Sequence, residues 1–335
     1  MDHLECALRC AVQEIAECVY NGSRMPPTAI QEIVQRKRAQ KAAAGAALAP
    51  HNWAERSVQG LRIVQVPAFR EFPWLIHGFS TRAGGVSALG GENVLNLGFT
   101  DWDARKNVLE NRQRFQSALG AKKLSMVALK QGHSDLVRLY ESAPAQPKYG
   151  DAAVTNHPGL LLAVQTADCV PILLVDPKRR AVAAIHAGWR GTLRRIAAKT
   201  VGHMRMHFGS KPVDIFAAIG PAIGGCCYEV GTEIGADFLS QFADAPDFFD
   251  EFRTGDEPNP IQWLNQMPPG HQPPPKNVLL DLHKANASQL RDAGIKEKNI
   301  FVSNLCTACR TDLLFSYRKQ GARSGRLVAA AGIRS

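Results

Sequence analysis

The stretch from Val164 to Gly191 constrains this chain more than any other, because it sets two candidate metal ligands at the ends of neighbouring strands. Cys169 stands just before one apolar, strand-like run, and His186 ends the next. A glycine-rich turn that contains Arg190 follows and opens a helix. Since neighbouring parallel strands bring such ends together, we expect a thiolate, an imidazole and an arginine on one surface. This combination is typical of a metal site that faces an anionic substrate.

The composition is ordinary for a soluble globular protein of one or two domains, with 45% hydrophobic and 21% charged residues in a chain of 335. No apolar run approaches the roughly 20 residues that span a bilayer. The N-terminus lacks a basic segment followed by an apolar block, so no secretory signal is expected. The eight cysteines are therefore expected to be reduced thiols of a cytoplasmic protein.

The positive charge is concentrated in one segment. The net charge is +10, and the stretch from Pro177 to Val213 holds nine Lys or Arg residues and no acidic one. Nucleic-acid binding is one interpretation of such a segment. An apolar stripe runs through the same segment, however, and no aromatic stacking platform lies between the basic residues. We therefore expect a solvated basic face beside a small phosphate site, and no nucleic-acid partner.

Residues 1–60 are expected to form a helical N-terminal extension and a linker. The first 38 residues mix polar and apolar positions as a helix does, and residues 39–50 are rich in alanine and low in complexity. The main domain is expected over residues 61–335. Seven prolines between Thr254 and Asn277 predict an irregular surface insertion in it.

Strands and helices alternate along the main domain. Short apolar runs bounded by proline, glycine or aspartate predict buried strands, and helical spacing of apolar residues predicts the helices. Their alternation indicates a mixed α/β core. The expected helices are Asp103–Leu119, Thr192–Phe208 with Thr192 as its cap, and His283–Ala293. The expected strands are Leu61–Val66, Leu160–Val164, Val170–Val175, Ala181–His186, Val213–Ile219, Val278–Leu282, Ile300–Ser303 and Leu327–Ala330.

A metal held by Cys169 and His186 needs a third protein ligand, and spacing alone leaves several histidines open. His203 and His207 are four residues apart on a predicted helix, which suits a metal, but they lie beyond the basic turn. The remaining candidates are His77, His133 and His157.

Six motifs occur in order along the chain: Phe79–Ser87, Asn96–Gly98, Val164–Gly191, Gly220–Ile223, Cys226–Val230 and Phe315–Arg318. Together they resemble the bacterial YfiH/YlmD family, also called the multicopper polyphenol oxidase (laccase) domain family and the peptidoglycan-editing factor family. The resemblance covers about residues 61–335. It implies mixed β-sheets flanked by helices and layered α/β/β/α, a YfiH-like fold. It also implies a purine nucleoside phosphorylase that acts on adenosine, inosine and methylthioadenosine, with adenosine deaminase activity.

The resemblance further implies a zinc ion held by two histidines and one cysteine. By position in the family motifs, these ligands are His133, Cys169 and His186. The motif around His133 reads Gln-Gly-His-Ser, where the family has Gln-Val-His-Gly, so the ligand is kept while its loop differs. Three protein ligands leave a fourth position open, as in a catalytic zinc site.

The implied chemistry gives roles to several further residues. Phosphorolysis requires a phosphate beside C1′ of the ribose, and Arg190 at the start of the Thr192 helix offers donors that match it. Arg82, in a glycine-rich loop, is a second phosphate candidate. Asp168 is a candidate proton carrier for deamination, or a residue that holds a loop or a metal ligand in place.

The nucleoside pocket is assigned by the resemblance alone. It places Tyr228 and Arg318 in the lining of that pocket, together with Ser316 and Tyr317. Asn96 is expected to shape the pocket, although a role in capping its own loop explains an asparagine there equally well.

The remaining cysteines are expected to be packing and loop thiols near the active face. Cys226 and Cys227, taken with Cys306 and Cys309, form a possible four-thiolate zinc set. We disfavour that set, because adjacent cysteines rarely both point at one ion and one Cys-x-x-Cys pair is a weak signal.

Two other activities carry the same family names. One is editing of cell-wall precursors, in which an amino acid is removed from a muramic-acid nucleotide. The other is copper-dependent phenol oxidation, which requires clustered histidines such as His-x-His pairs. The ten histidines of this chain are scattered and include no such pair, so zinc is expected rather than copper.

Overall fold

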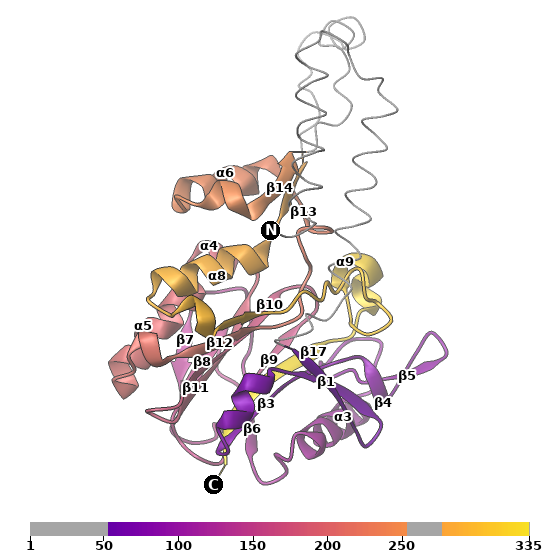
Figure 1. Cartoon of the computed structure of the whole chain (residues 1–335). Helices are drawn as coiled ribbons and strands as arrows, with labels where there is room; N and C mark the ends of the chain where they lie inside the picture. Colours follow the sequence, from indigo (N-terminus) through magenta and orange to yellow (C-terminus); the bar gives the residue numbers. More distant parts are fainter. Residues whose placement is uncertain (1–52, 253–276, 335) are drawn as a thin grey trace, which may run out of the picture. The chain divides into compact units, whose positions relative to one another are not determined.

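Two six-stranded β-sheets pack face to face and form the centre of the protein (Figure 1). The structure is a computed structural model that describes residues 53–252 and 277–334. The expected helix over residues 1–38 and the alanine-rich linker lie outside the described residues. So does the proline-rich insertion, apart from Asn277.

The first sheet has the strand order β1-β2-β3-β17-β9-β6. Its neighbours are antiparallel except for β6 and β9, which run parallel. The strands are β1 (Ala54–Val58), β2 (Leu61–Gln65), β3 (Leu75–Ser80), β17 (Leu327–Ile333), β9 (Leu160–Thr166) and β6 (Ser125–Ala128).

The second sheet has the strand order β16-β12-β10-β11-β8-β7. Its two edge pairs, β12 with β16 and β7 with β8, are parallel, and the strands between them are antiparallel. The strands are β16 (Ile300–Val302), β12 (Phe216–Ile219), β10 (Val170–Asp176), β11 (Ala181–Ala187), β8 (Ala152–Thr155) and β7 (Val137–Leu139).

Strand β10 shows why these strands are apolar throughout rather than alternating. Its Leu173 and Val175 lie between the two sheets, where they join the same core as Val164 of β9. Ile172 and Leu174 point to the other face and pack in the core that contains the helices. Since successive side chains of a strand point to opposite faces, a sheet covered on both sides needs apolar residues at every position.

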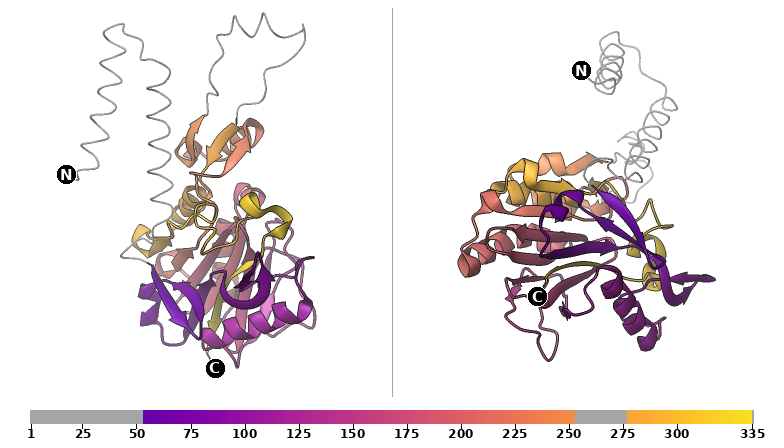
Figure 2. Two further views of the ribbon diagram at one scale, coloured as in Figure 1. Left: turned by 90° about the vertical axis from the view of Figure 1, so that its right-hand side faces the viewer. Right: turned by 60° about the horizontal axis from the view of Figure 1, so that its bottom comes forward.

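Helices cover the outer face of each sheet, and Figure 2 shows α3 and α5 on opposite sides of the pair. Helices α5 (Ile196–Phe208) and α8 (Leu282–Asp292) pack on the second sheet. Helix α3 (Arg105–Ala118) packs on the first sheet, where its Phe115 shares a core with Ile63. The expected α/β/β/α layering is confirmed.

Smaller elements surround this framework. A hairpin pairs β4 (Ala83–Leu89) with β5 (Glu92–Val94), and a three-stranded sheet has the order β13-β15-β14. Its strands are β13 (Glu229–Gly231), β15 (Asn277–Leu280) and β14 (Phe249–Phe252). The remaining helices are α4 (Trp189–Leu193), α6 (Thr232–Gln241), α9 (Tyr317–Gln320) and the 3-10 turns Pro67–Glu71, Pro212–Asp214, Ala245–Phe248, Glu297–Asn299 and Gly321–Arg323.

The structure differs from the sequence-based expectations at several places. The expected strand Val278–Leu282 ends at Leu280, and Leu282 begins α8. The first sheet begins with β1, ahead of Leu61. The expected helix Thr192–Phe208 is two helices, because Arg195 has a left-handed conformation with φ 61° and separates α4 from α5. Thr192 therefore lies inside α4 rather than capping a long helix. The expected strand Val213–Ile219 begins only at Phe216, since residues 212–214 form a 3-10 turn.

None of the helices that the structure describes is long and apolar enough to cross a membrane.

Candidate active site

Cys169 and His186 come together because β10 and β11 form a tight antiparallel hairpin. Val170 pairs with Ala187 and Pro171 pairs with His186, so the start of β10 lies beside the end of β11. The expectation of parallel strands was wrong, although the two residues do meet. The sequence does indicate the antiparallel direction, because only four residues connect β10 to β11. A crossover between parallel strands needs a dozen residues or more.

His133 reaches the same point from the loop that follows β6. Strand β6 pairs in parallel with β9, and the side chain of Gln131 continues this contact. Its Oε1 accepts from the backbone N–H of Gln165 at 2.7 Å, and its Nε2 donates to the carbonyl of the same residue at 2.8 Å. His133 itself has a left-handed backbone with φ 57°, which turns the chain sharply at the site.

The three expected ligands form one cluster. Their ligand atoms all lie within 4.8 Å of one another, and His133 Nε2 is 3.7 Å from Cys169 Sγ. A tetrahedral zinc with bonds of roughly 2.0 to 2.3 Å separates its nitrogen and sulfur ligands by about 3.5 Å, close to the observed spacing. The cluster has an open side, since His133 is exposed, Cys169 is half-buried and His186 is buried.

Asp151, a residue that the sequence analysis missed, organises this cluster. Its Oδ1 lies 2.8 Å from Nδ1 of His186, and it accepts from the backbone N–H of His133 at 3.0 Å. The backbone N–H and the hydroxyl of Ser134 both donate to its Oδ2 at 2.6 Å. One buried carboxylate therefore orients one ligand and fixes the loop that carries another, as carboxylates behind metal-binding histidines do.

Gly188 leaves room for the cluster. A Cβ atom at this position would lie 2.8 Å from Cδ2 of His133 and 3.1 Å from Sγ of Cys169. Any other residue would push these two side chains away from their present positions. The glycine of the turn after β11 is thus required by close packing against two of the three ligands.

The charges of the cluster favour metal binding. Burial would raise the pKa of the Cys169 thiol, but the charge of His186 and hydrogen bonds from both histidines lower it to about 6. Burial works against a charged His186 as well, yet Cys169 and Asp151 together raise its pKa to about 9. For Asp151, the bonds from His186 and Ser134 outweigh burial and hold its pKa below the usual range. Cys169 is therefore a thiolate at neutral pH, the form that binds metals.

A cavity of about 690 Å³ opens over the cluster. Five further residues from the sequence analysis line it, namely Asp168, Arg190, Tyr228, Tyr317 and Arg318. The structure adds residues to which the sequence analysis gave no role, although five of them lie inside the motifs Val164–Gly191 and Gly220–Ile223. They are Leu129, Gln131, Gln165, Thr166, Ala167, Trp189, Ile223, Leu282 and Arg326.

The Asp168 carboxylate is engaged by two neighbours. Its Oδ1 accepts from the hydroxyl of Thr307 at 2.5 Å, and its Oδ2 accepts from the backbone N–H of Arg318 at 2.6 Å. Asp168 has a positive φ of 85°, which bends the chain just before Cys169. Asp168 thus joins the loop that carries Cys169 to the segment that carries Arg318.

Three arginines line the cavity, and their other contacts differ. Arg318 donates to the carbonyl of Glu229 at 2.9 Å, and Arg326 donates to the carbonyl of Ser324 at 2.9 Å. The Arg190 guanidinium lies 4.6 Å from the ring of Trp189, and no residue of the described chain accepts a hydrogen bond from it. Its donors are therefore available to an anion. Helix α4, which carries Arg190, has only five residues, so the expected support from a long helix is absent.

Arg82 and Asn96 do not line the cavity. Arg82 donates to the carbonyl of Thr311 at 2.5 Å and pairs with Glu92 at 3.3 Å. Asn96 is fully buried, and its Oδ1 accepts from the backbone N–H of Arg326 at 2.9 Å. Arg82 therefore ties together two loops, and Asn96 supports the backbone of a residue that does line the cavity.

The other candidate histidines lie elsewhere. His77 is buried in β3, where its Nε2 accepts from the backbone N–H of Val66 at 3.1 Å. His203 and His207 are neighbours on α5 with ring centroids 5.5 Å apart, and His157 follows β8. None of them lines the cavity.

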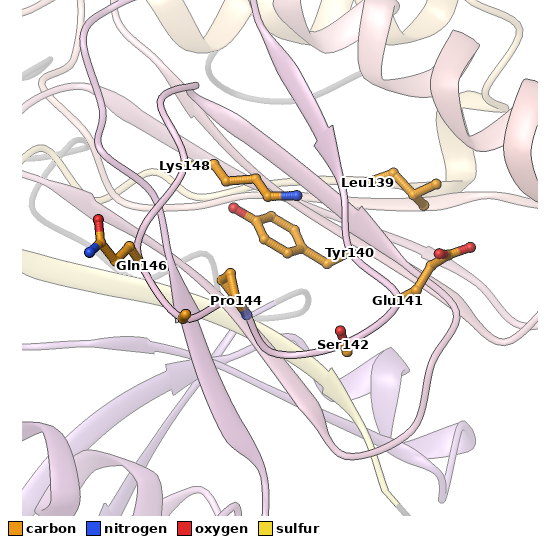
Figure 3. A pocket seen from close by; sticks show the side chains of 8 residues that line it. Leu139, Tyr140, Glu141, Ser142, Pro144, Gln146 and Lys148 are labelled. Atoms are coloured by element: carbon orange, nitrogen blue, oxygen red, sulfur yellow. The ribbon is translucent and has the colours of Figure 1, made fainter.

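A second hollow, of about 390 Å³, lies at the end of β7 and is shown in Figure 3. Lys148 extends over the ring of Tyr140 there, with Nζ 5.3 Å from the ring centroid. None of the residues expected to carry chemistry lines this hollow.

Comparison with known proteins fixes the family. Residues 76–334 match the family described as multi-copper polyphenol oxidoreductase laccase, which is more than half of the chain. The chain belongs to this family. Within the laccase-domain family, relatives that resemble the chain carry the name purine nucleoside phosphorylase, so the resemblance drawn from the motifs is confirmed.

Two such relatives and one solved structure illustrate the similarity. The purine nucleoside phosphorylase of Deinococcus radiodurans is 38% identical over 257 residues, or 77% of this chain and 88% of the relative. The purine nucleoside phosphorylase YlmD of Geobacillus stearothermophilus is 34% identical over 274 residues, or 78% and 92%. The crystal structure of the Bacillus licheniformis hypothetical protein YfiH has a TM-score of 0.71 at 29% identity and covers 84% of this chain and 99% of that one.

Proposed function

We propose that this protein is a zinc-dependent purine nucleoside phosphorylase that acts on adenosine, inosine and methylthioadenosine and also deaminates adenosine. The observation that carries the proposal is the meeting of His133, Cys169 and His186, with ligand atoms within 4.8 Å of one another, in the wall of a cavity that also contains Arg190. The names of the relatives support the phosphorylase part of this proposal.

The donor set fits a zinc ion. Two imidazoles and a thiolate are ligands that zinc prefers, and they leave one position open toward the cavity. Asp151 occupies Nδ1 of His186, so that Nε2 faces the cluster. A zinc ion in this site would act as a Lewis acid toward a substrate atom.

Copper-dependent phenol oxidation finds less support, despite the family description. Within residues 53–252 and 277–334, only two groups of His, Cys, Asp or Glu are close enough to hold a metal, and only one of them contains histidine. Oxidases with several coppers need more imidazole ligands than this one cluster supplies.

Phosphate binding falls to the arginines of the cavity. Arg190 provides a planar fork of N–H donors that no acceptor among the described residues uses, and such a fork matches two phosphate oxygens. Arg318 and Arg326 add positive charge to the same cavity. The phosphate oxygen would then attack C1′, and the C1′–N9 bond would break as the purine takes the electron pair and a proton.

The cavity also suits a nucleoside. Its volume of about 690 Å³ is in the range of small-molecule sites, and Trp189, Tyr228 and Tyr317 supply aromatic surface for a base and a ribose. Burial raises the pKa of the Tyr228 phenol, so its hydroxyl stays protonated and can donate to the substrate.

For Asp168 we propose a positioning role. Both of its carboxylate oxygens already accept hydrogen bonds, from Thr307 and from the backbone of Arg318. In this arrangement it sets the distance between the metal ligand Cys169 and the arginine side of the cavity. Its replacement would slow both phosphorolysis and deamination, because both reactions use the same cavity.

An assay of adenine release from adenosine tests the proposal. The wild-type protein should release adenine only when phosphate is present, and Cys169→Ala and His186→Ala should abolish this release. His207→Ala, an exposed histidine on α5, serves as the matched control and should keep full activity. Formation of inosine without phosphate reports deamination, and a muramic-acid nucleotide is assayed beside it. Wild-type turnover by a folded, metal-free Cys169→Ala protein would refute the proposal.

A further inference from the structure

Four cysteines meet outside the active-site cluster. Cys226 and Cys227 lie in the loop after β12, and Cys306 and Cys309 lie in the loop after β16. Their sulfur atoms all lie within 4.8 Å of one another. The Sγ atoms of Cys226 and Cys227 are 3.6 and 3.5 Å from Sγ of Cys309. The sulfurs of the adjacent Cys226 and Cys227 therefore do approach one point in this loop, an arrangement that the sequence analysis expected to be rare.

We infer that these four cysteines bind a structural zinc ion as a tetrathiolate site. A zinc ion with four bonds of about 2.3 Å to sulfur places its ligands at the corners of a tetrahedron whose edges are about 3.8 Å long. The two separations from Cys309, 3.6 and 3.5 Å, are close to this value, and every other pair of sulfurs lies within 4.8 Å. Four protein ligands close the coordination shell, so that the ion would stabilise the fold and take no part in turnover.

The backbone around the cluster is already arranged as in a zinc-binding turn. The N–H of Gly224 donates to Sγ of Cys306 at 3.2 Å, which supports a negative charge on that sulfur. The N–H of Arg310 donates to the carbonyl of Cys306 at 3.0 Å and closes a tight turn around the Cys-x-x-Cys pair. An isolated β-bridge between Ala222 and Cys306 holds the two loops side by side.

A disulfide explains this cluster less well. Cys226 and Cys227 are almost equally distant from Cys309, and a bond to either would leave two sulfurs unused in the same small space. The sulfurs are also well beyond the 2.05 Å of an S–S bond. All four cysteines are free in the structure. A single ion uses every sulfur, and zinc brings no redox chemistry of its own.

The site would act by joining two loops that shape the active-site cavity. Tyr228, directly after Cys227, lines that cavity. Thr307, between Cys306 and Cys309, holds the Asp168 carboxylate at 2.5 Å. Loss of the ion would loosen both contacts, and no ligand of the first metal would be lost.

Zinc analysis of the full-length chain tests the inference. After dialysis against a weak chelator, the wild-type protein should hold two zinc ions per chain. Cys169→Ser should hold one, in the cysteine cluster, and the double variant Cys306→Ser/Cys309→Ser should hold one, in the active site. A wild-type protein that holds one ion and loses it in Cys169→Ser would overturn the inference.

The Cys169→Ser protein is also suited to X-ray absorption spectroscopy. Its four clustered cysteines are intact, so a folding defect of the cysteine loops cannot explain the spectrum. X-ray absorption at the zinc edge should report four sulfur ligands at about 2.3 Å. Nitrogen or oxygen ligands in this spectrum would contradict the site, and so would iron in place of zinc. A mass of the non-reduced protein that is two hydrogen atoms below that of the reduced protein would indicate a disulfide and would also contradict it. These readouts do not use activity, so they separate this inference from the proposed phosphorylase function.

Discussion

His186 Nδ1 lies 2.8 Å from Oδ1 of Asp151, and the backbone N–H of His133 donates to the same carboxylate at 3.0 Å. One acid thus controls two of the three proposed metal ligands, although it does not line the cavity. It acts on His186 through ring orientation and on His133 through loop conformation. The following predictions test this arrangement and the roles assigned around it.

Replacing Asp151 with asparagine should weaken metal binding while all three ligands remain. The amide carries no charge, so it would hold the His186 ring and the Ser134 backbone less firmly. Changes of this kind cost about 10- to 100-fold in metal affinity. Competition with a chelator measures the loss. Asp135→Asn, in the same loop but paired with Lys199, is the matched control, and equal zinc affinity in the two variants would count against the role of Asp151.

Gly188→Ala should lose metal binding and activity together. Its new methyl group would lie 2.8 Å from His133 and 3.1 Å from the Cys169 sulfur, so one ligand must move. Gly202→Ala provides the control, because nothing lies within 4 Å of a Cβ there and the position is inside α5. That variant should gain about 0.5 to 1 kcal/mol of stability. Zinc content and adenosine turnover report the difference. Full zinc loading of Gly188→Ala would show that the ligands need no such space.

Arg190→Gln should raise the KM for phosphate more than the KM for the nucleoside. The loss of a charge-assisted hydrogen bond is worth about 1.5 to 3 kcal/mol, which corresponds to roughly 10- to 100-fold in kcat/KM for phosphate. Arg82→Gln should leave the KM for phosphate unchanged, because Arg82 bonds to Thr311 and Glu92 instead. Steady-state kinetics with phosphate as the varied substrate separates the two variants. The reverse order of effects would return phosphate binding to Arg82.

The layers of the fold could be predicted from the sequence, because buried sheets require apolar runs such as Leu160–Val164. Strand direction could also be predicted, but only from the short connection between β10 and β11, in which the carboxylate of Asp176 accepts from the backbone of Lys178 and Arg179. The break at Arg195 left no mark in the apolar pattern, which continues across α4 and α5.

The three proposed metal ligands were taken from family motifs, and their ligand atoms lie within 4.8 Å of one another, whereas the residues that support them were not predicted. Asp151 is 18 residues from His133 and 35 from His186 in the chain, and its role arises only from contacts across loops. The meeting of the four clustered cysteines could not be predicted for a similar reason. Whether Cys226 and Cys227 face one point depends on the backbone of a glycine-rich loop, which spacing does not reveal.

The stability of the protein should fall between pH 6.5 and pH 4 in part because of His77. Burial lowers the pKa of His77 to about 4, whereas in the unfolded chain it is close to 6.5. The unfolded state therefore binds a proton in this range that the folded state does not, and stability decreases as the pH falls. The full effect is about 3 kcal/mol.

His77→Gln removes this titrating group. The free energy of unfolding of the variant should therefore fall by about 3 kcal/mol less than that of the wild type over the same pH range. Urea unfolding at pH 7.5 and at pH 4 measures the change in the free energy of unfolding for each protein. Subtracting the change of the variant from that of the wild type removes the contribution of the other titrating groups. Parallel curves for the wild type and the variant would show that His77 does not titrate as its burial requires.

Anomalous diffraction at the zinc edge, from crystals of the full-length protein, tests the central claim most directly. One anomalous peak, separate from any peak at the cysteine cluster, should lie about 2.0 to 2.3 Å from a nitrogen of His133, the sulfur of Cys169 and Nε2 of His186, with an open side toward the cavity. A zinc-loaded crystal with no peak between these three side chains would contradict the account of the active site.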